Sequence, residues 1–568
     1  APVYISAGLD EKEAEKHPEY LLCFSPDPEE QKKEWEQPHF HFLCFNSPYL
    51  DLLAAQTEEV MRKYNPCGIF FDIVGQRVCY CETCQRLMKE RGLDINNEDD
   101  RNTFARITLD KYFDTVNRAV RKYSDTATIF HNAGHLHKGD YDFINRSTHQ
   151  ELESLPTGGW GYDHFPLSAA YARTLKNTDY LGMTGKFHHS WGEFGGFKHP
   201  NALIYETSLS VANGAGCSIG DQLHPLGEMN PATYNLIGKA YSLIEEKEPW
   251  LNGAENLADI AVLSAEALTN SRQAGEKPDS GANRMLLEKK YLYDFIDLNA
   301  DLSKYKMLIL PDIPGMTDSF IDKLKKFISE GGKVIATGES IVKDGKFVID
   351  CGAEYKGENE YNPAYFVPAF DTVNGKTEYV MKAKSYLFEP NGCEVVGYGQ
   401  NPYFNRTREH FCSHAHAPNN PDSQYPAVLI NGNIAYVGWD IFTAYAKEGH
   451  LIFKEIFAYL AERLLGDGAA VKVEMPDRGV VTLTEQASER RRILHLLFAH
   501  TTVRGINTEV IESAVPLFNV RCSVKAENAP KRVVLVPEGK EIDFVFENGR
   551  VNFTVPEVTL HQMVSIEE

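Results

Sequence analysis

The stretch GIFFDIV, residues 68–74, is a short apolar run that contains one carboxylate, Asp72. Its length and its aromatic and β-branched content predict a buried strand. A buried aspartate is costly unless it has a partner or a function. In enzymes built from parallel strands, the carboxyl ends of the strands carry the catalytic groups. We therefore predict that Asp72 is catalytic. The alternative is that it supports a neighbouring site residue or caps a helix in the loop that follows.

Five further short apolar runs accompany GIFFDIV and alternate with amphipathic helical patterns, such as residues 47–64 and 99–123. The runs are PVYIS (2–6), TATIFHNAG (126–134), HQELES (149–154), YLGMTGKFHH (180–189) and CSIGDQLH (217–224). This alternation predicts an α/β fold with a parallel sheet, and we expect residues 1–250 to form a TIM-type (β/α)8 barrel. Only six strands are visible where a closed barrel needs eight. Either two strands escape detection, or the chain begins inside the barrel without its first two strands.

Two more regions follow the predicted barrel. Residues 258–465 combine strands such as DIAVLSAE (259–266) and KVIATGE (333–339) with the helix pattern DSFIDKLKKFISEGG (318–332), which predicts a second α/β domain. Residues 466–568 carry short alternating strands with turn signals, which predicts a small C-terminal β-sandwich.

Charge and composition exclude some classes of partner. The net charge is −22, and a surface this acidic repels phosphate backbones, so we expect no nucleic-acid partner. No apolar run approaches the ~20 residues of a membrane span, so we expect no membrane partner. Eleven cysteines at low density do not form a secreted disulfide framework, and we expect reduced thiols and a cytoplasmic location.

Three cysteines lie close together in VCYCETC (78–84), as Cys79, Cys81 and Cys84. A thiolate metal site needs several soft donors close to one another, and this spacing supplies three of them. Cys44 is our first choice for the fourth ligand, with Cys67 and Cys23 as alternatives. We predict a structural zinc, because four thiolates leave no open position for water; the alternative is a set of buried thiols near a helix start.

Glycoside hydrolysis normally requires two carboxylates, and Asp72 is a suitable first one. Candidates for the second are Glu151 and Glu153, which would share one face of a strand, and Glu193 in a glycine-rich loop. Histidine and tryptophan side chains suit neutral sugars, because they supply hydrogen bonds and stacking surfaces. The residues predicted to bind substrate are His131, His188, His189, Trp160, Trp191 and Asp221.

The first 250 residues resemble the fucosidase-related group of hypothetical glycosyl hydrolases, which includes the family 151 α-L-fucosidases. The resemblance is carried by YISAGLDEKEAEKHPEYL, GIFFDIVGQRVCYCETC, THQELESLPTGGWGYDHFP and YLGMTGKFHHSWGEFGGFK. GIFFDIV also resembles the family 29 α-L-fucosidase strand that ends in the nucleophile, which implies a retaining mechanism through Asp72. QELESLPTGGWGY is similar to the family 29 acid region and implies Glu151 at its glutamate, although Gln150 stands where that pattern has Trp.

A second resemblance is to family 42 β-galactosidases. CFNSPYL and CYCETC look like the zinc site of their barrels. Their barrels are followed by a flavodoxin-like trimerisation domain and a small β domain, which implies the same for residues 258–465 and 466–568, and a homotrimer. This chain departs from them at Asp72-Ile73, where they have Asn-Glu at the end of the fourth barrel strand.

Three hypotheses follow. The first is a retaining, exo-acting α-L-fucosidase, with a carbohydrate substrate and no organic cofactor. The second is a glycosidase of other specificity, such as a β-galactosidase. The third is a truncated or inactive barrel that serves as a carbohydrate-binding or assembly protein.

Overall fold

The computed structural model describes residues 1–568, and the chain divides into two compact units. Unit 1 consists of Ala1–Leu136, Tyr141–Leu152 and Asn177–Tyr180. Unit 2 consists of His137–Asp140, Glu153–Lys176 and Leu181–Glu568. The three domains predicted from the sequence remain a prediction, because this division follows other boundaries.

The centre of unit 1 is a parallel sheet of β1 (Val3–Ser6), β2 (Gly68–Asp72) and β3 (Thr128–His131). Ser6 pairs with Asp72 across β1 and β2, and Phe71 pairs with His131 across β2 and β3. β4 (His149–Glu153) begins beside β3, because Thr148 N donates to Ile129 O at 2.8 Å. The helices of this part of the chain are α1 (Glu11–Lys16), α2 (Pro28–Trp35), α3 (Tyr49–Tyr64), α4 (Glu82–Glu90), α5 (Glu98–Arg121) and α6 (Tyr141–Ile144).

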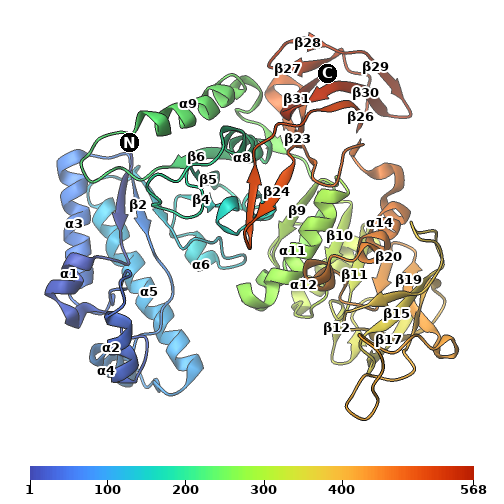
Figure 1. The fold of residues 1–568 in the computed structure, drawn as a ribbon, viewed down its shortest axis with the longest axis horizontal. Coiled ribbons are helices and arrows are strands. Elements are labelled where there is room, and N and C mark those ends of the chain that lie inside the picture. The colour runs from blue at the N-terminus through green and yellow to red at the C-terminus, as the bar shows by residue number, and fades with distance from the viewer. The chain divides into compact units, whose positions relative to one another are not determined.

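Two long helices, α3 and α5, pack together and run alongside β2 (Figure 1). Both helices are amphipathic and bury residues three or four apart, such as Leu50 and Leu53 in α3. Asn97 caps α5 by accepting a hydrogen bond from Asp100 N, and Asn65 ends α3 in the left-handed conformation. The buried side chains of these helices and of the sheet form one apolar core.

One face of the sheet carries a row of rings from successive strands. Tyr4 lies 5.6 Å from Phe70, Phe70 lies 5.2 Å from Phe130, and Phe130 lies 5.6 Å from His149, between ring centroids. Side chains two residues apart on a strand share a face. The next level of the same face therefore holds Asp72.

Unit 2 includes the remaining strands predicted before residue 250. β5 (Asp179–Gly185) and β6 (Gly216–Gly220) pair in parallel over Leu181–Gly185 and Gly216–Gly220. The helices around them are α7 (His164–Ala172), α8 (Pro200–Ala212) and α9 (Pro231–Glu245). With these two strands, all six strands expected in residues 1–250 are present.

A nine-stranded sheet forms the second part of unit 2, in the order β16-β15-β18-β19-β20-β11-β10-β8-β9. Strands β20, β11, β10, β8 and β9 pair in parallel, and the others extend the sheet antiparallel. The strands are β8 (Ile260–Leu263), β9 (Tyr293–Ile296), β10 (Met307–Leu310), β11 (Lys333–Thr337), β15 (Ala364–Pro368), β16 (Tyr379–Met381), β18 (Glu394–Gln400), β19 (Tyr425–Asn431) and β20 (Ile434–Val437). The helices are α10 (Ala265–Thr269), α11 (Arg272–Glu288), α12 (Asp318–Ser329), α13 (Ile441–Glu448) and α14 (Leu451–Leu465). Two small pairs, β12 (Val342–Lys343) with β13 (Lys346–Phe347) and β14 (Ala353–Glu358) with β17 (Tyr386–Pro390), complete this region.

The C-terminal part of unit 2 is all β, with sheets in the orders β21-β26-β30-β29 and β28-β27-β31-β23-β22-β7. Buried side chains from both sheets meet in one core. The strands are β7 (Glu255–Asn256), β21 (Val471–Val473), β22 (Val480–Gln486), β23 (Arg491–Phe498), β26 (Leu517–Lys525), β27 (Arg532–Val536), β28 (Lys540–Glu541), β29 (Phe544–Glu547), β30 (Arg550–Val558) and β31 (Leu560–Glu567). A separate hairpin joins β24 (Thr501–Arg504) to β25 (Thr508–Ile511).

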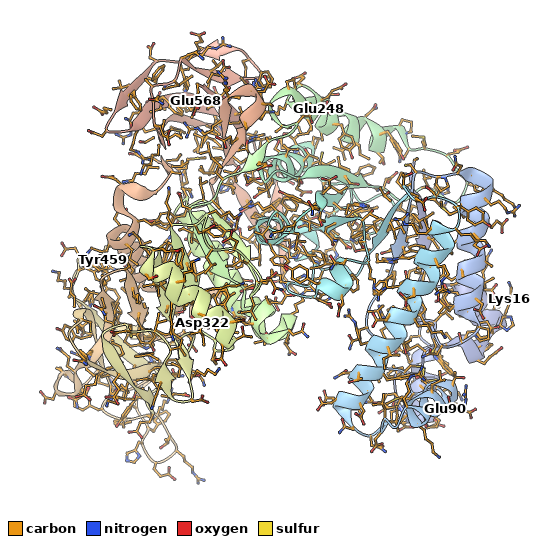
Figure 2. All side chains as sticks on the ribbon, turned by 180° about the vertical axis from the view of Figure 1, so that it is seen from behind. Lys16, Glu90, Glu248, Asp322, Tyr459 and Glu568 are labelled. Atoms are coloured by element: carbon orange, nitrogen blue, oxygen red, sulfur yellow. The ribbon has the colours of Figure 1, made fainter.

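Charged side chains are plentiful on the outside of both units, and Lys16 at the end of α1 and Glu90 at the end of α4 project from the ribbon (Figure 2). None of the helices is long and apolar enough to cross a membrane.

A buried chain of basic groups lies within unit 2. Lys247 Nζ is 3.1 Å from His561 Nδ1, His561 Nε2 is 3.2 Å from His495 Nδ1, and His495 Nε2 is 3.3 Å from Thr484 Oγ1. Burial, together with the nearby Lys247 ammonium, lowers the pKa of His495 to about 3 and holds the pKa of His561 well below its usual range. Both imidazoles are therefore neutral in the folded protein at neutral pH.

We expect the buried His495 and His561 to make the protein less stable in mild acid. Between about pH 6.5 and about pH 3, His495 binds a proton in the unfolded chain but not in the folded one. The free energy of unfolding therefore decreases by about 1.4 kcal/mol for each unit by which the pH is lowered. Calorimetric unfolding temperatures should fall less steeply below pH 6.5 for His495→Gln than for the wild type. The control is His500→Gln, at an exposed histidine, which should keep the wild-type slope. Equal slopes for all three proteins would contradict the assignment.

Candidate active site

The Asp72 carboxylate receives a hydrogen bond on each oxygen. Tyr4 Oη donates to Oδ2 at 2.6 Å from β1, and Asn132 Nδ2 donates to Oδ1 at 2.8 Å from the end of β3. Both donors come from segments beside β2: Asn132 directly follows His131, which pairs with Phe71, and Tyr4 pairs with Phe70 and reaches Asp72 from the preceding level of the same face. Asp72 is half-buried. The carboxylate is thus fixed in orientation and not sealed off, as a nucleophile requires.

The orientation of the Asn132 amide is itself fixed. Gly134 N donates to Asn132 Oδ1 at 2.9 Å, so the amide nitrogen is the atom that turns to Asp72. The Asn132 backbone continues the ladder with β2, because its N donates to Phe71 O and its O accepts from Val74 N, each at 2.8 Å. Asn132 therefore couples the carboxylate to the loop that leaves β3.

The residue after Asp72 has a strained backbone. Ile73 has φ = 61°, in the left-handed region that a β-branched residue rarely enters. Its carbonyl oxygen lies against Gly8, where an added Cβ would approach it to 2.2 Å. Such strain costs on the order of 1–3 kcal/mol, persists only where the surroundings enforce it, and clusters at functional sites. The sequence gives no sign of it, since Ile is an ordinary strand residue.

Glu151 lies in unit 1 and is paired with a histidine. His149 Nε2 is 3.0 Å from Glu151 Oε1, and both side chains are largely buried. The two residues are two positions apart on β4, so they share a face of the strand. The His149 ring also lies beside Phe130, at the end of the row of rings described above.

Glu153 lies in unit 2, at the end of β4, and its carboxylate accepts a hydrogen bond from Trp191. The Trp191 Nε1 to Glu153 Oε1 distance is 2.5 Å. The indole lies on the ends of β5 and β6, where an added Cβ at Gly185 or Gly220 would come within 2.9 Å or 2.4 Å of the ring. Glycine at these two positions is what lets the tryptophan approach the strands.

Glu193 is used within its own loop. Its Oε2 accepts from His189 N at 2.9 Å, and its side chain covers Gly196. Lys186 Nζ donates to Glu193 O at 3.3 Å and to Gly196 O at 3.0 Å, which closes the loop from the other side. These contacts give Glu193 a structural role in shaping the loop.

His131 does not belong to the Asp72 face, which corrects the expectation that it binds substrate. Its ring is buried, Nδ1 lies 3.0 Å from Tyr112 Oη, and Nε2 lies 2.9 Å from Asn117 Oδ1, both on α5. Burial, and secondarily the charge of Arg146, lowers the pKa of His131 to about 3. The ring stacks on Phe71, so it faces the helices and not the face of the sheet that carries Asp72.

The other residues predicted to bind substrate lie in loops of unit 2. His188 and His189 are exposed and follow β5, Asp221 directly follows β6, and Trp160 stands edge-on to His164 with ring centroids 4.9 Å apart. Trp191 is 37% exposed although its nitrogen is bonded, so one surface of the indole is open for stacking.

Four cysteines in unit 1 form a cluster that could hold a metal ion: Cys44, Cys79, Cys81 and Cys84. The Sγ of Cys44 lies 3.9 Å from that of Cys81 and 3.5 Å from that of Cys84. A tetrahedral zinc with Zn–S bonds of about 2.3 Å requires sulfurs about 3.8 Å apart, so the spacing fits.

Amide groups surround the cysteine cluster, as expected for thiolates. Four N–H groups point at the sulfurs, each with N–S distances of 3.4 Å. They come from the backbones of Cys23, Asn46 and Cys84 and from the Asn46 side chain. Of the alternative ligands, Cys23 contributes only its backbone N–H and Cys67 is exposed.

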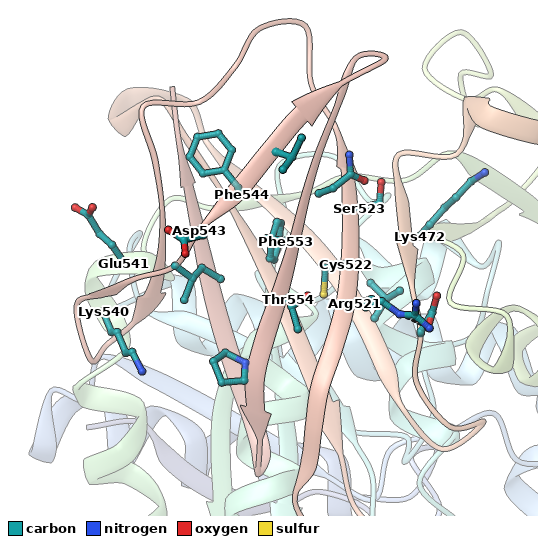
Figure 3. Close-up of a pocket in the computed structure, with 16 residues that line it drawn as sticks. Lys472, Arg521, Cys522, Ser523, Lys540, Glu541, Asp543, Phe544, Phe553 and Thr554 are labelled. Atoms are coloured by element: carbon teal, nitrogen blue, oxygen red, sulfur yellow. Dashed lines mark hydrogen bonds and ion pairs between the residues drawn. The ribbon is translucent and has the colours of Figure 1, made fainter.

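A groove of about 970 Å³ lies in the C-terminal sheets of unit 2 and contains none of the predicted site residues. Arg521 and Glu474 form an ion pair on one wall, and Lys540, Glu541 and Asp543 line the other (Figure 3). Positive and negative side chains are equally represented in its lining. The sequence did not indicate this groove, because its lining residues are spread over several short strands of ordinary alternating pattern.

Comparison with known proteins gives the class of protein to which this chain belongs. Residues 284–460 match the family described as "Beta-galactosidase trimerisation domain". No curated protein matches the chain. Among solved structures, an alpha-L-fucosidase, isoenzyme 2 from Paenibacillus thiaminolyticus, is 45% identical, with 100% of this chain and 87% of that chain covered and a TM-score of 0.95.

The chain belongs to the same family as that α-L-fucosidase, and it is a glycosidase. Two β-galactosidases share the fold at lower identity. A GH42 beta-galactosidase from G. stearothermophilus is 13% identical over 100% of this chain and 88% of that chain, with a TM-score of 0.68. The beta-galactosidase from Bacillus circulans sp. alkalophilus is 14% identical over 99% and 88%, with a TM-score of 0.67.

Proposed function

We propose that the protein is a retaining, exo-acting α-L-fucosidase with Asp72 as its nucleophile. The observation that carries this proposal is the Asp72 carboxylate, which is oriented by Tyr4 and Asn132 and followed by the strained Ile73. The relative of 45% identity that is named an α-L-fucosidase supports the sugar specificity. The parallel sheet β1-β2-β3 in unit 1 and the parallel pair β5-β6 are each consistent with a (β/α)8 barrel as the scaffold.

In the first step, one oxygen of Asp72 attacks the anomeric carbon while the bond from that carbon to the leaving oxygen breaks. A glutamic acid protonates the leaving oxygen. In the second step the same glutamate takes a proton from water, and the water oxygen displaces Asp72 from the anomeric carbon. The hydrogen bonds from Tyr4 and Asn132 fix the orientation of the Asp72 side chain, which lowers the cost of reaching the attack geometry.

Glu153 is our choice for the acid and base, ahead of Glu151 and Glu193. A general acid must be free to donate to the leaving oxygen, and Glu151 Oε1 already bonds the His149 ring at 3.0 Å. Glu193 is committed to its own loop. Glu153 lies two residues beyond Glu151, at the end of the strand, and its carboxylate accepts from the Trp191 indole.

The nucleophile is tested by Asp72→Gly. We expect kcat on aryl α-L-fucosides to fall by about 10³-fold or more, because no other group forms the covalent intermediate. Azide should restore turnover and give the β-configured fucosyl azide. Asp125→Ala, at an exposed aspartate just before β3, is the control and should keep full activity. Fucoside turnover that survives the loss of Asp72 would overturn the assignment, and aryl β-galactosides in the same panel would reveal the other specificity.

The acid is tested by comparing Glu151→Gln, Glu153→Gln and Glu193→Gln on substrates with good and poor leaving groups. For the acid residue, kcat/KM should fall by about 10²-fold or more with a poor leaving group and far less with 2,4-dinitrophenolate, which needs no proton. Azide should then give the α-configured product. We expect this signature for Glu153 alone, and its appearance in Glu151→Gln would move the role to that residue.

We propose that the cysteine cluster holds one structural zinc ion. The zinc would join the segment around Cys44 to the start of α4, next to the loop that leaves Asp72, and would take no part in catalysis. The eleven free cysteines are also consistent with the reducing, cytoplasmic location we infer.

Metal analysis tests the zinc proposal. The wild type should contain about one zinc per chain, and Cys81→Ser should lose most of it and unfold at a lower temperature. Cys67→Ser, at an exposed cysteine outside the cluster, should keep both the metal and the stability. Wild-type protein with well under one zinc per chain would contradict the proposal.

A homotrimer is the assembly that we propose, from the match of residues 284–460 to a trimerisation domain. A β-galactosidase activity is less well supported, because the matching β-galactosidases are only 13–14% identical and share the fold alone.

A further inference from the structure

A buried lysine directly after β5 is bonded to backbone carbonyls and not to a carboxylate. Lys186 is 3% exposed, and its Nζ donates to Glu193 O at 3.3 Å and to Gly196 O at 3.0 Å. The ammonium also lies 4.8 Å and 4.6 Å from the ring centroids of Phe187 and Phe197. Burying an ammonium without a carboxylate costs free energy, because carbonyl oxygens and ring faces replace its hydration only in part. Stability alone therefore does not explain this lysine.

Lys186 begins the segment of residues 186–198, which we call the β5–α8 loop, and both ends of this loop are fixed. At its start, Lys186 N donates to Gly220 O at 3.0 Å, which continues the pairing of β5 with β6. At its end, Lys198 N donates to Lys186 O at 2.8 Å, and Lys198 Nζ forms a buried ion pair with Glu206 on α8 at 2.7 Å. The ends of the loop therefore cannot move independently of β5 and α8.

The β5–α8 loop carries an indole that is bonded to the proposed acid. Trp191 Nε1 donates to Glu153 Oε1 at 2.5 Å. The backbone next to that carboxylate is held as well, because Ser154 N donates to Met183 O on β5 at 2.8 Å. The side chain of Glu153 can still rotate, and the hydrogen bond from the indole limits this rotation.

Contacts within the loop determine where the indole lies. The Trp191 ring stands edge-on to the buried Phe187, with ring centroids 5.7 Å apart. Farther along the loop, Glu193 Oε2 accepts from His189 N, and Glu193 O accepts from Lys186 Nζ. The Lys186 ammonium thus holds the backbone two residues beyond Trp191. Its loss would loosen the turn that carries the indole.

We propose that Trp191 is a positioning residue for Glu153, and that Lys186 acts through it by binding the loop carbonyls that keep the indole N–H on the carboxylate. This inference rests on the proposed role of Glu153 as the acid and base. All of these residues belong to unit 2. The indole N–H and the open ring surface are different parts of Trp191, so this role is separate from the stacking predicted from the sequence.

The test uses two variants of the full chain. Trp191→Phe keeps an aromatic ring and removes the N–H, and Lys186→Met keeps the aliphatic stem and removes the ammonium. With a poor leaving group, kcat/KM on α-L-fucosides should fall by about tenfold in both variants. With 2,4-dinitrophenolate it should fall by less than about twofold, because only the proton transfer is misaligned. Equal losses on both substrates, as a lost stacking surface or misfolding would cause, would overturn the proposal.

Lys290→Met and Trp250→Phe are the matched controls, and both lie in unit 2. Lys290 is 5% exposed, and its ammonium donates to the carbonyl oxygens of Leu287, Glu288 and Asp477. Trp250 is half-buried and packs against a small apolar cluster. Both controls should keep the wild-type ratio of the two kcat/KM values even where their stability falls. A tenfold change of this ratio in the controls would contradict a specific role for Trp191 and Lys186.

A double variant tests whether the indole acts through Glu153. In the Glu153→Gln background, Trp191→Phe should lower kcat/KM by less than about threefold more, because both changes act through one carboxyl group. A further tenfold loss in that background would refute the role of Trp191. If Lys186→Met does not fold, Lys186→Gln replaces it, since its shorter side chain keeps an amide donor but cannot hold both carbonyls. It should give a smaller loss, again with the poor leaving group only.

Hydrogen–deuterium exchange gives a readout that does not depend on activity. Exchange in residues 187–197 should rise in Lys186→Met and stay at the wild-type level in Lys290→Met. Unchanged exchange in Lys186→Met refutes the role of Lys186, whatever sugar the enzyme cleaves. Raised exchange in Lys186→Met, together with full activity in Glu153→Gln, refutes the proposed role of Glu153 and leaves the anchoring of the loop intact.

Discussion

The hydrogen bonds that Asp72 receives from Tyr4 and Asn132 are the constraint on which the site depends. A carboxylate at the end of an apolar strand must be satisfied, and only neighbours on the adjacent strands are close enough to do so. The parallel register of β1, β2 and β3 places Asn132 beside Asp72 and places Tyr4 one level before it on the same face. The helices α3 and α5, the glycine at position 8 and the strained Ile73 can be understood as what keeps these three strands in that register.

Much of this arrangement could be predicted from sequence, because the strands carry local signals. The six strands before residue 250 were found from short apolar runs, and Asp72 was chosen because it interrupts one of them. The cysteine cluster was also predictable, since three of its members lie within six residues, and Cys44 was the correct first choice for its fourth member. In both cases the signal that led to the prediction lies within a few consecutive residues.

The errors and omissions have a different physical origin. His131 was expected to bind substrate, but strand residues alternate between faces, and it falls on the side of α5. Tyr4 was overlooked because its role depends on a register with a strand more than sixty residues away. Ile73 carries no signal, because backbone strain is imposed by the surroundings.

Side chains alternate between the two faces along β1 and β2, and this alternation decides which segments can change in length. Residues 7–67 connect the two strands, and those parts of the segment that do not contact β2 or the cysteine cluster can lengthen or shorten without changing the face on which Tyr4 and Asp72 lie. A single inserted or deleted residue between Tyr4 and Ser6, or between Phe70 and Asp72, would instead turn one partner to the opposite face. The site therefore depends on the number of residues within each strand. Related chains can differ in the length of the connection between β1 and β2, but each strand must keep the spacing that places its side chain on the shared face.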